Sequence, residues 1–588
     1  MAHLGSATCE LVGWTDCPAG FALDSSGWGC DAILPEEACT GATREALGAS
    51  DCQPIGDCAA PFPPVGATLF VDDDYSAAQL DATHFASLQP ALDAARSGAV
   101  IAVEAGTYCA SIYIDHGVTV VGRCAEQVSI VNDTSLYPGV EVLSQDEVHI
   151  RNVSIRGYES GLSVNSGGRL VLEDSLLADN IIEGLVVYGD GHVIVRQSVV
   201  RGTVNKTPSD QTLGVFVFGG GVLEMYDSSV VANVEAGVGI IDAGSALLFD
   251  GVIIRDTRPK DEAGGLGLKA FDGAAVQLRR TAFKGNRIIS LMLDGVGVEA
   301  TVEQTVVRET VLDPRTEGGQ AWGVAARNGA RLTLNDSAIW DTPSVALSVQ
   351  ADPSSVVATR VVIGRVGSAG PIGVGMAVTV EMGGQLEMTD SALFASTGVA
   401  VLVNNAASHA AIIHSVISDS MPLQGALRTG ECGYALIAAA GGGAVISEST
   451  FQRNAEVTLA VVNAGSSLAV FGALIDDTQA NALGSFGDGL MVGADASAVV
   501  DRTLVRRSRR IGVVDDGASI LVTRSRIESN AIGIHVQNGS TLREASDPQP
   551  AAASMECVVS TDTAFVGNGT RIGSGEVPVP DLMNAPGI

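Results

Sequence analysis

GLSVNSGGRLVLEDSLLADN begins at Gly161, GVFVFGGGVLEMYDSSVVAN at Gly214 and GLKAFDGAAVQLRRTAFKGN at Gly267, so one pattern is written three times. The period is 53 residues in both steps, 214 − 161 and 267 − 214. A weaker copy starts 23 residues into each period, at Gly184, Gly237 and Ser290. The repeating unit is therefore a short turn of chain followed by a long one.

The apolar residues within a copy alternate or form short β-branched groups, as at Leu170, Leu172, Val193 and Val195. This period is typical of strands and not of helices. The strands are short and bounded by Gly, Asn, Asp or Ser, and no two-residue Asn-Gly turn recurs to reverse the chain. Repeats of this kind cannot bury an apolar face alone, so successive copies must stack and pair in parallel. The pattern predicts a parallel β-helix.

Polar residues recur at the corners of the repeat and predict ladders along the bends. The short-turn series is Asn180, Asn233, Asn286, Asp341, Ser396 and Asn454. The long-turn series is Thr203, Thr257, Thr310, Val366, Ser420 and Thr478. A repeated amide or hydroxyl can bond to the turn backbone and to the next copy, which satisfies groups left open by strand pairing.

Residues 1–60 hold six of the ten cysteines, among Gly, Pro, Asp and Trp: Cys9, Cys17, Cys30, Cys39, Cys52 and Cys58. This segment has little apolar periodicity, so we expect disulfides to hold it together in an oxidising compartment. Fifteen connectivities are open. Zinc is the weaker alternative, because no C-x-x-C pair occurs and His3 is the only nearby histidine.

After a Pro-rich joint, residues 80–96 include an amphipathic run with Phe85, Leu88, Leu92 and Ala95 on one face, and Gly98 ends it. The strings VIAVEAGTY and VTVVG then predict the first strands. A helix in this position would cover the open end of the stack. The helix, the Gly-Thr-Tyr strand, VTVVG and the Gly-Leu or Gly-Val turns together resemble the right-handed parallel β-helix proteins of the pectate-lyase-like superfamily. Within that superfamily the chain is similar to secreted deltaproteobacterial members, of myxobacterial type, that carry a preceding Cys-rich segment.

The resemblance implies a right-handed coil of about 18 turns. We divide the chain into a Cys-rich segment (1–60), a linker with the capping helix (61–100), the β-helix (101–541), and a last turn with a capping tail (542–588). Cys109 and Cys124 lie on neighbouring early strands, and we expect them to bridge consecutive turns. Cys432 and Cys557 lie four turns apart, roughly 20 Å, so we expect free or buried thiols.

The long corners carry insertions such as TVNKTPSDQTL, TRPKDEAGG and SMPLQGALRTGECG. They predict a row of loops on one side of the coil, either as decoration or as a wall that binds a partner.

Motifs for catalysis are not found in the family's form, so we assign no catalytic residue and no metal ligand. A lyase of this fold needs a carboxylate cluster for calcium beside a basic residue, and a glycosidase needs two or three carboxylates at one sugar bond. Ile114-Asp115-His116 has the same residues as an Ile-Asp-His motif of lyases with this fold. It lies in the first turns, however, and the lyase motif does not, so we treat the match as coincidence. Asp476-Asp477 could mimic the adjacent aspartates of polygalacturonases, and Gly191-His192 could supply their histidine. The two pairs lie ten turns apart, about 48 Å, so they cannot form one site.

Seven arginines crowd between residues 502 and 526 of a chain with only 34 Lys plus Arg. Stacked arginines could grip an acidic glycan, and a neighbouring acid pair could hold calcium. The candidate binding residues are Arg506, Arg507, Arg509, Arg510, Asp495, Asp515, Asp516 and His535. The alternative is a ladder of ion pairs on a solvated face. Apart from calcium, no cofactor is expected.

The net charge of −33 argues against a nucleic-acid partner. No apolar run reaches transmembrane length, and the first residues lack an apolar signal core, so either the signal has been removed or export takes another route. Two functions remain open. One is a non-catalytic exported or cell-surface scaffold or adhesin, whose loops bind a polysaccharide or a surface protein. The other is an enzyme acting on an acidic polysaccharide. The sequence leaves the oligomeric state undetermined.

Overall fold

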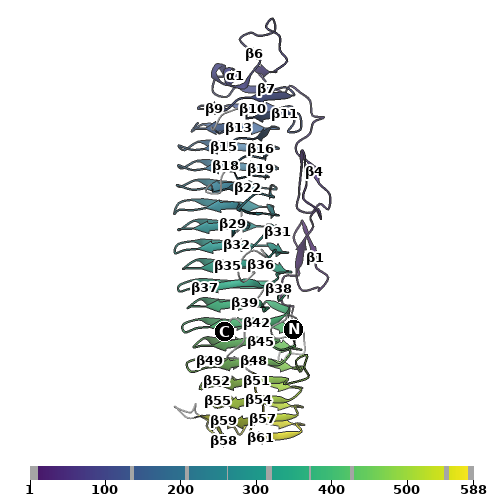
Figure 1. Cartoon of the computed structure of the whole chain (residues 1–588), viewed down its shortest axis with the longest axis vertical. Helices are drawn as coiled ribbons and strands as arrows, with labels where there is room; N and C mark the ends of the chain where they lie inside the picture. Colours follow the sequence, from purple (N-terminus) through teal and green to yellow (C-terminus); the bar gives the residue numbers. More distant parts are fainter. Residues whose placement is uncertain are drawn as a thin grey trace. The chain divides into compact units, whose positions relative to one another are not determined.

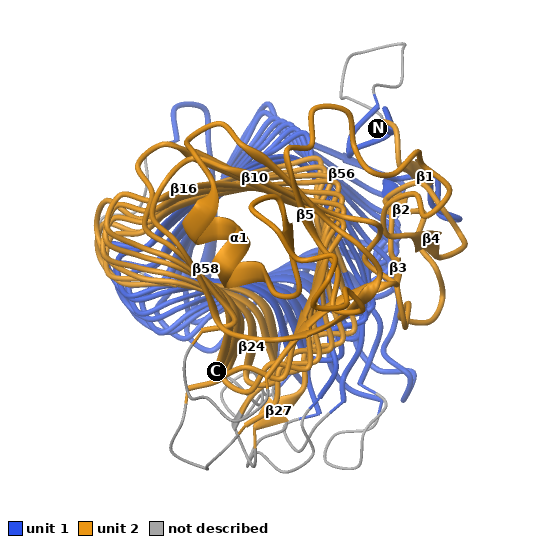
Figure 2. Ribbon diagram, turned by 90° about the horizontal axis from the view of Figure 1, so that it is seen from above, with its two compact units in different colours: residues 1–17, 23–30, 308–588 blue, residues 18–22, 31–307 orange. Residues whose placement is uncertain are grey.

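The structure is a computed structural model that describes residues 11–132, 138–205, 211–260, 263–312, 321–369, 373–423, 430–548 and 555–580. The chain divides into unit 2, residues 18–22 and 31–307, and unit 1, residues 1–17, 23–30 and 308–588. Both units are built from short parallel strands that pair with the strands of the next turn (Figures 1 and 2). The parallel β-helix that the repeats predict is therefore confirmed.

Each full turn in unit 2 supplies one strand to a first sheet, here sheet 1, and two strands to a second, sheet 2. Sheet 1 contains β9 (Ile112–Ile114), β12 (Val140–Val142), β15 (Ser160–Val164), β18 (Glu183–Val187), β21 (Leu213–Val217), β24 (Ala236–Ile240), β29 (Leu266–Phe271) and β32 (Ile289–Asp294). Sheet 2 contains β5 (Leu69–Val71), β6 (His84–Phe85), β7 (Val100–Val103), β8 (Gly106–Cys109), β10 (Thr119–Gly122), β11 (Val128–Val131), β13 (Glu147–Arg151), β14 (Ser154–Arg156), β16 (Arg169–Glu173), β17 (Leu176–Ala178), β19 (His192–Arg196), β20 (Val199–Arg201), β22 (Val222–Tyr226), β23 (Ser229–Val231), β25 (Ala246–Asp250), β26 (Ile253–Arg255), β30 (Ala275–Arg279), β31 (Ala282–Lys284) and β33 (Glu299–Glu303).

Unit 1 follows the same plan. Its part of sheet 1 contains β35 (Trp322–Arg327), β37 (Val345–Gln350), β39 (Gly375–Glu381), β42 (Gly398–Asn404), β45 (Tyr434–Ala439), β48 (Val457–Val462), β51 (Asp488–Gly493), β54 (Ile511–Asp516), β57 (Ile532–Gln537) and β61 (Thr570–Ser574). Its part of sheet 2 contains β36 (Arg331–Trp340), β38 (Ser355–Val366), β40 (Gln385–Thr389), β41 (Ala392–Ser396), β43 (His409–Ile413), β44 (Val416–Ser418), β46 (Gly443–Ser447), β47 (Thr450–Gln452), β49 (Ser467–Phe471), β50 (Leu474–Asp476), β52 (Ser497–Asp501), β53 (Leu504–Arg506), β55 (Ser519–Thr523), β56 (Arg526–Glu528), β58 (Thr541–Ala545), β59 (Glu556–Ser560) and β60 (Ala564–Val566).

The core is a column of aliphatic side chains that alternate inward along every strand. In sheet 1 of unit 2, one such column is fully buried in register: Val140, Leu162, Leu185, Val215, Val238 and Leu268. Each buried Val or Leu contributes about 1.5–3 kcal/mol relative to an exposed one. The two strands of sheet 2 in one turn are joined by a residue in the left-handed region, such as Asp174 (φ 47°) or Asp227 (φ 46°). Short polar side chains tolerate this region, so Asp is suited to the bend.

The only helix among the described residues is α1 (Leu88–Ala94), which lies across the end of the coil in unit 2 (Figure 2). Its buried residues are Leu88, Ala91 and Leu92, so the capping helix is confirmed, although it is shorter than the amphipathic run. Gly98, at φ 82°, turns the chain into β7. No described helix is long and apolar enough to cross a membrane.

The corner amides form the expected ladder, but the two corner series alternate in one stack. Asn233 is fully buried, and its Oδ1 accepts from Thr203 N and Oγ1 at 3.2 and 3.1 Å. Its Nδ2 donates to Val200 O at 3.1 Å. Asn286 repeats this arrangement on Thr257 and on the carbonyl of Ile254. A short-turn Asn therefore supports the long-turn Thr of the preceding turn.

We expect Asn233→Ala to lower the free energy of unfolding by roughly 2–3 kcal/mol, because it leaves a buried N–H, a hydroxyl and a carbonyl unpaired. Urea unfolding measures this loss. The exposed Gln127→Ala should change it by less than about 0.5 kcal/mol. Equal losses for the two variants would contradict a structural role for the ladder.

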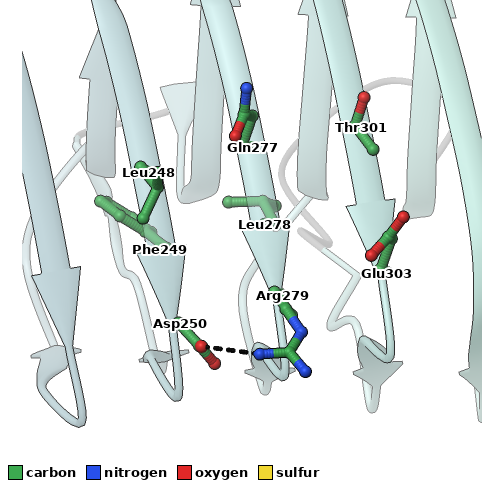
Figure 3. Close-up of a pocket in the computed structure, with 8 residues that line it drawn as sticks. All are labelled: Leu248, Phe249, Asp250, Gln277, Leu278, Arg279, Thr301 and Glu303. Carbon is green, nitrogen blue, oxygen red and sulfur yellow. Dashed lines mark hydrogen bonds and ion pairs between the residues drawn. The ribbon is translucent and has the colours of Figure 1, made fainter.

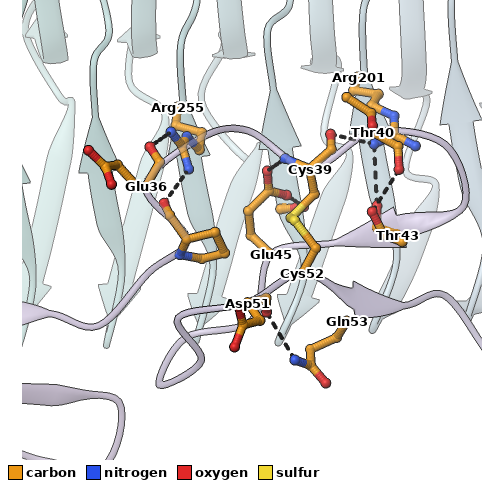
Figure 4. Close-up of a disulfide and its surroundings, with 12 residues drawn as sticks. Glu36, Cys39, Thr40, Thr43, Glu45, Asp51, Cys52, Gln53, Arg201 and Arg255 are labelled. Atoms are coloured by element: carbon orange, nitrogen blue, oxygen red, sulfur yellow. Dashed lines mark hydrogen bonds between the residues drawn. A yellow bond between two sulfur atoms is a disulfide. The ribbon is translucent and has the colours of Figure 1, made fainter.

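The N-terminal segment, residues 11–58, docks onto the coil. In unit 2 a short hairpin, β3 (Thr43–Arg44) with β4 (Gln53–Pro54), carries the Cys39–Cys52 disulfide (Figure 4). In unit 1 Cys17 pairs with Cys30, and Trp340 Nε1 donates to Cys30 O at 3.1 Å.

The expected bridge between Cys109 and Cys124 is wrong. Cys124 pairs with Cys58, which ties the N-terminal segment to the second turn of unit 2, and Cys109 is an exposed free thiol. Cys9 lies outside the described residues. Cys432 and Cys557 are buried and form no disulfide, as their separation predicts.

Candidate functional site

The outer face of sheet 1 in unit 2 carries polar and aromatic side chains at the positions that alternate with the core. Tyr113 pairs with Glu141, and the same register continues through Ser163, Val186 and Phe216. Tyr113 is 45% exposed. Because the period is two residues, this row faces away from the core column.

Three aromatic rings stand together on this face. Tyr188 stacks on Phe218, with ring centroids 5.0 Å apart and planes 3° apart. Phe216 adds a third ring, 4.7 Å from Phe218. All three rings are partly exposed. Tyr188 and Phe218 each follow the end of a strand, β18 and β21, in consecutive turns, and Phe216 lies within β21.

A polar network borders these rings. Asn165 Nδ2 donates to Glu141 Oε1 and to Tyr188 Oη, both at 2.9 Å. Ser166 Oγ donates to Asn165 Oδ1 at 2.8 Å. Asn165 therefore fixes the hydroxyl end of Tyr188 beside a carboxylate. Aromatic surface next to fixed hydrogen-bonding groups suits a ligand with apolar and hydroxylated sides.

The opposite margin of this face is charged. Glu235 Oε1 lies 3.6 Å from Lys269 Nζ, and Oε2 lies 3.8 Å from Lys260 Nζ. Oε2 also accepts from Thr212 N at 2.9 Å. Lys260 ends β27 (Pro259–Lys260), which pairs with β28 (Ala263–Gly264) in a long-corner insertion. Other residues of these insertions, including 206–210 and 261–262, lie outside the described residues.

A pocket of about 340 Å³ opens on sheet 2 of unit 2 (Figure 3). It lies over β25, β30 and β33 and is lined by Leu248, Phe249, Asp250, Gln277, Leu278, Arg279, Thr301 and Glu303. Asp250 binds Arg279 Nη1 at 3.1 Å and Arg280 Nε at 2.6 Å. Two carboxylates, Asp250 and Glu303, therefore reach one pocket with an arginine between them in the strand order.

The neighbouring strands β19 and β22 carry a second cluster of polar side chains, His192, Glu224 and Tyr226. Glu224 accepts from Tyr226 Oη at 2.6 Å and lies 2.9 Å from His192 Nε2. The Tyr226 hydrogen bond, aided by His192, lowers the pKa of Glu224, and the same bond raises the pKa of Tyr226 to about 12. This carboxylate therefore stays ionised and serves as an acceptor.

Four of the seven arginines of residues 502–526 are held by aspartates of the preceding turn. Asp476 binds Arg507 through Nε at 2.8 Å and Nη2 at 2.6 Å, and it also binds Arg506. Asp488 forms a bidentate pair with Arg510, and Asp501 one with Arg524. These partners are not the aspartates in the candidate set. A guanidinium held on two N–H groups has fewer donors for a glycan.

The other predicted residues of that set are dispersed. Asp515 is fully buried, where Ser540 Oγ donates to it at 2.7 Å, and His535 is buried with Nε2 on Gly575 O at 2.8 Å. Asp516 accepts from Gln537 Nε2 at 2.9 Å, on the outer side of sheet 1. Asp495 and Arg509 lie on exposed corners. The set does not form one surface site.

Asp72, Asp73 and Asp74 place carboxylate oxygens within 4.8 Å of one another. Asp72 Oδ1 accepts from Asp74 N at 3.0 Å and Asp73 Oδ2 from Thr107 N at 2.9 Å. Asp72 therefore stabilises its own turn, a use typical of Asp, and Asp73 ties this turn to β8.

Sequence reasoning missed Glu141, Asn165 and Phe216. The available signal was the alternation: Phe216 is one residue from the inward Val215 and must face outward.

The similarity of the chain to known proteins concerns its fold. Residues 104–256 match the family model described as Right handed beta helix region. A comparison with curated proteins finds no match.

Solved structures resemble the chain at low identity. The N-terminal fragment of bacteriophage Phi29 gene product 12 is 10% identical, with a TM-score of 0.32 over 81% of this chain and 88% of that one. The catalytic unit of a GH87 alpha-1,3-glucanase from Streptomyces thermodiastaticus is 10% identical, with a TM-score of 0.24 over 89% and 73%. The PL6 family alginate lyase AlyGC is 10% identical, with a TM-score of 0.22 over 82% and 88%. Likeness at these TM-scores supports no functional argument. The strand pairing and the family match together identify the fold as a right-handed parallel β-helix.

Proposed function

We propose that this protein is an exported, non-catalytic β-helix scaffold that binds a glycan on the outer face of sheet 1 in unit 2. The observation that supports this is the aromatic group of Tyr188, Phe216 and Phe218 beside the Asn165–Glu141 network. Sugar rings offer apolar C–H faces to aromatic rings and hydroxyls to amides and carboxylates.

The described disulfides support export, because such bonds persist in oxidising compartments. A binding role is favoured over proton transfer because the two carboxylates nearest the described network, Glu141 and Glu235, are already engaged. Glu141 accepts from an amide, and Glu235 is shared by two lysines and a backbone N–H. Since the chain carries a net charge of −33, an uncharged polysaccharide suits the site better than an acidic one.

Affinity electrophoresis in gels containing hydroxyethylcellulose, xylan, pectin or alginate tests this proposal. We expect retardation in at least one neutral polymer, and a loss of about tenfold in affinity for Tyr188→Ala and Phe216→Ala, equal to about 1.4 kcal/mol. Retardation should persist with EDTA, because the site uses no calcium. Phe471→Ala, a partly buried aromatic of sheet 2 in unit 1, is the matched control. Equal retardation of all variants, or none for the wild type, would overturn the proposal.

A carbohydrate-active enzyme is the second candidate, and Asp250 and Glu303 favour it because they bring two carboxylates to one pocket. Asp250, however, is held by Arg279 and Arg280. Release of reducing ends or of unsaturated products from the same polymers would establish this activity, and its loss in Glu303→Gln would place it in the pocket.

A further inference from the structure

The pocket on sheet 2 in unit 2 combines free hydrogen-bonding groups with balanced charge. Arg279 is 56% exposed, and one of its nitrogens is used by Asp250. Among the described residues, none forms an ion pair or a side-chain hydrogen bond with the carboxylate of Glu303. Gln277 and Thr301 lie on the same strands as Arg279 and Glu303, two residues earlier. The pocket therefore offers amide and guanidinium donors together with carboxylate and hydroxyl acceptors.

The charges of the pocket are largely paired. Asp250 is held by Arg279 of the lining and by Arg280 outside it. The neighbouring Glu224 is held by Tyr226 and His192. No cationic excess therefore remains to offset the desolvation of an anionic ligand. Such an arrangement favours an uncharged ligand that both donates and accepts hydrogen bonds.

The apolar lining residues and the volume of the pocket further restrict the class of ligand that it could bind. Leu248 supplies an outward, partly exposed apolar side chain between Glu224 and Gln277 in the strand register. Tyr226 pairs with Asp250 at the pocket margin, and its hydroxyl is fixed by Glu224. A volume of about 340 Å³ falls at the lower end of the 300–1,000 Å³ typical of small-molecule sites.

We propose that this pocket is a separate binding site for an uncharged mono- or disaccharide, with Gln277 and Arg279 donating to its hydroxyls and Glu303 accepting from them. Leu248 and the nearby Tyr226 contact its C–H face. The site lies on sheet 2, not on the aromatic face of sheet 1, so it does not rest on the function proposed above.

Saturation-transfer difference NMR on the full chain tests the proposal, with maltose, cellobiose and lactose as neutral probes and glucuronate and glucosamine as charged ones. We expect saturation of at least one neutral disaccharide and weaker signals from both charged sugars. In titrations, Glu303→Gln and Gln277→Ala should each weaken binding tenfold or more. Glu299→Gln, on the same strand β33 but outside the pocket lining, should stay within twofold of the wild type.

Two results would overturn the proposal: no saturation of any neutral probe, or unchanged affinity in both pocket variants. Tighter binding of a charged sugar than of every neutral one would also overturn it. Tyr188→Ala, which removes the sheet 1 ring, should leave this binding unchanged, so failure here is distinguishable from failure of the glycan face.

Discussion

Glu45→Ala is expected to release residues 31–57 from the coil of unit 2, at a cost of roughly 3–5 kcal/mol in the free energy of docking, because two buried hydrogen bonds to a charged group are lost. Glu45 is fully buried. Its Oε1 accepts from Cys39 N at 2.8 Å, and its Oε2 accepts from Ser229 Oγ at 2.9 Å (Figure 4). Removal of the carboxylate leaves both donors without partners and takes a negative charge away from Arg201, whose pKa is lowered by burial.

Hydrogen exchange of β3 and β4, with limited proteolysis of residues 31–57, measures this release. The Cys39–Cys52 and Cys58–Cys124 bonds should hold the segment covalently, so the coil itself should keep its protection. Glu45→Gln keeps one acceptor oxygen and should have a smaller effect. Wild-type protection in Glu45→Ala would show that the arginine contacts alone hold the segment.

Those arginine contacts come from the ends of β20 and β26, which lie on either side of β23 in sheet 2. Arg201 Nη1 donates to Cys39 O at 2.8 Å. Arg255 is 2% exposed and donates to Pro35 O at 2.9 Å and Glu36 O at 3.0 Å. Arginine suits this task because its planar group can bond two carbonyls of an extended chain at once.

Asp515→Asn is expected to stabilise the protein at pH 8 by about 3 kcal/mol and to leave its stability almost unchanged at pH 4. Asp515 is fully buried, and burial raises the pKa of its carboxyl to about 6. Oδ1 accepts from Ala518 N at 3.0 Å and from Ser540 Oγ at 2.7 Å, whereas Oδ2 has no hydrogen-bond partner. An amide can keep the two bonds to oxygen and carries no charge.

The gain in stability at high pH follows from the difference between the folded and the unfolded pKa of Asp515. The folded pKa lies above the unfolded value of about 3.9, so the protonated carboxyl is stable in the fold below pH 4. That stability is lost as the pH rises through about 6. Thermal unfolding of both proteins at pH 4, 6 and 8 isolates this group from the other carboxylates, since only the difference between them is used. A difference that does not change with pH would contradict the assignment.

The sequence predicts the coil because the residues that form it follow a short-range pattern that every turn repeats. Alternation places Leu162 and Leu185 inward, and the repeated Asn233 and Asn286 indicate a ladder before any contact is known. The helix that covers the N-terminal end follows from Leu88 and Leu92 on one face. The outward rows of sheet 1 could have been read from the same alternation.

The pairings that sequence reasoning got wrong are those with distant partners. Cys109 lies 15 residues from Cys124 and is the nearest candidate along the chain, yet Cys58, 66 residues away, is the partner. The crowding of Arg506, Arg507 and Arg510 leaves two interpretations open, a glycan site or a ladder of ion pairs, and it does not indicate that the aspartates they bind lie one turn earlier, 22 to 31 residues before them. Spacing along a chain does not show which side of a solenoid a docked segment will cover.

The docking of the N-terminal segment also sets an order of events during synthesis. Residues 35 and 36 leave the ribosome long before Arg255, which follows Pro35 by 220 residues. At about 5–20 residues per second, the segment waits roughly 10–40 s for the groups that will hold it. The loop that carries Cys39 and Cys52 therefore has no surface to rest on until that part of the coil has been translated.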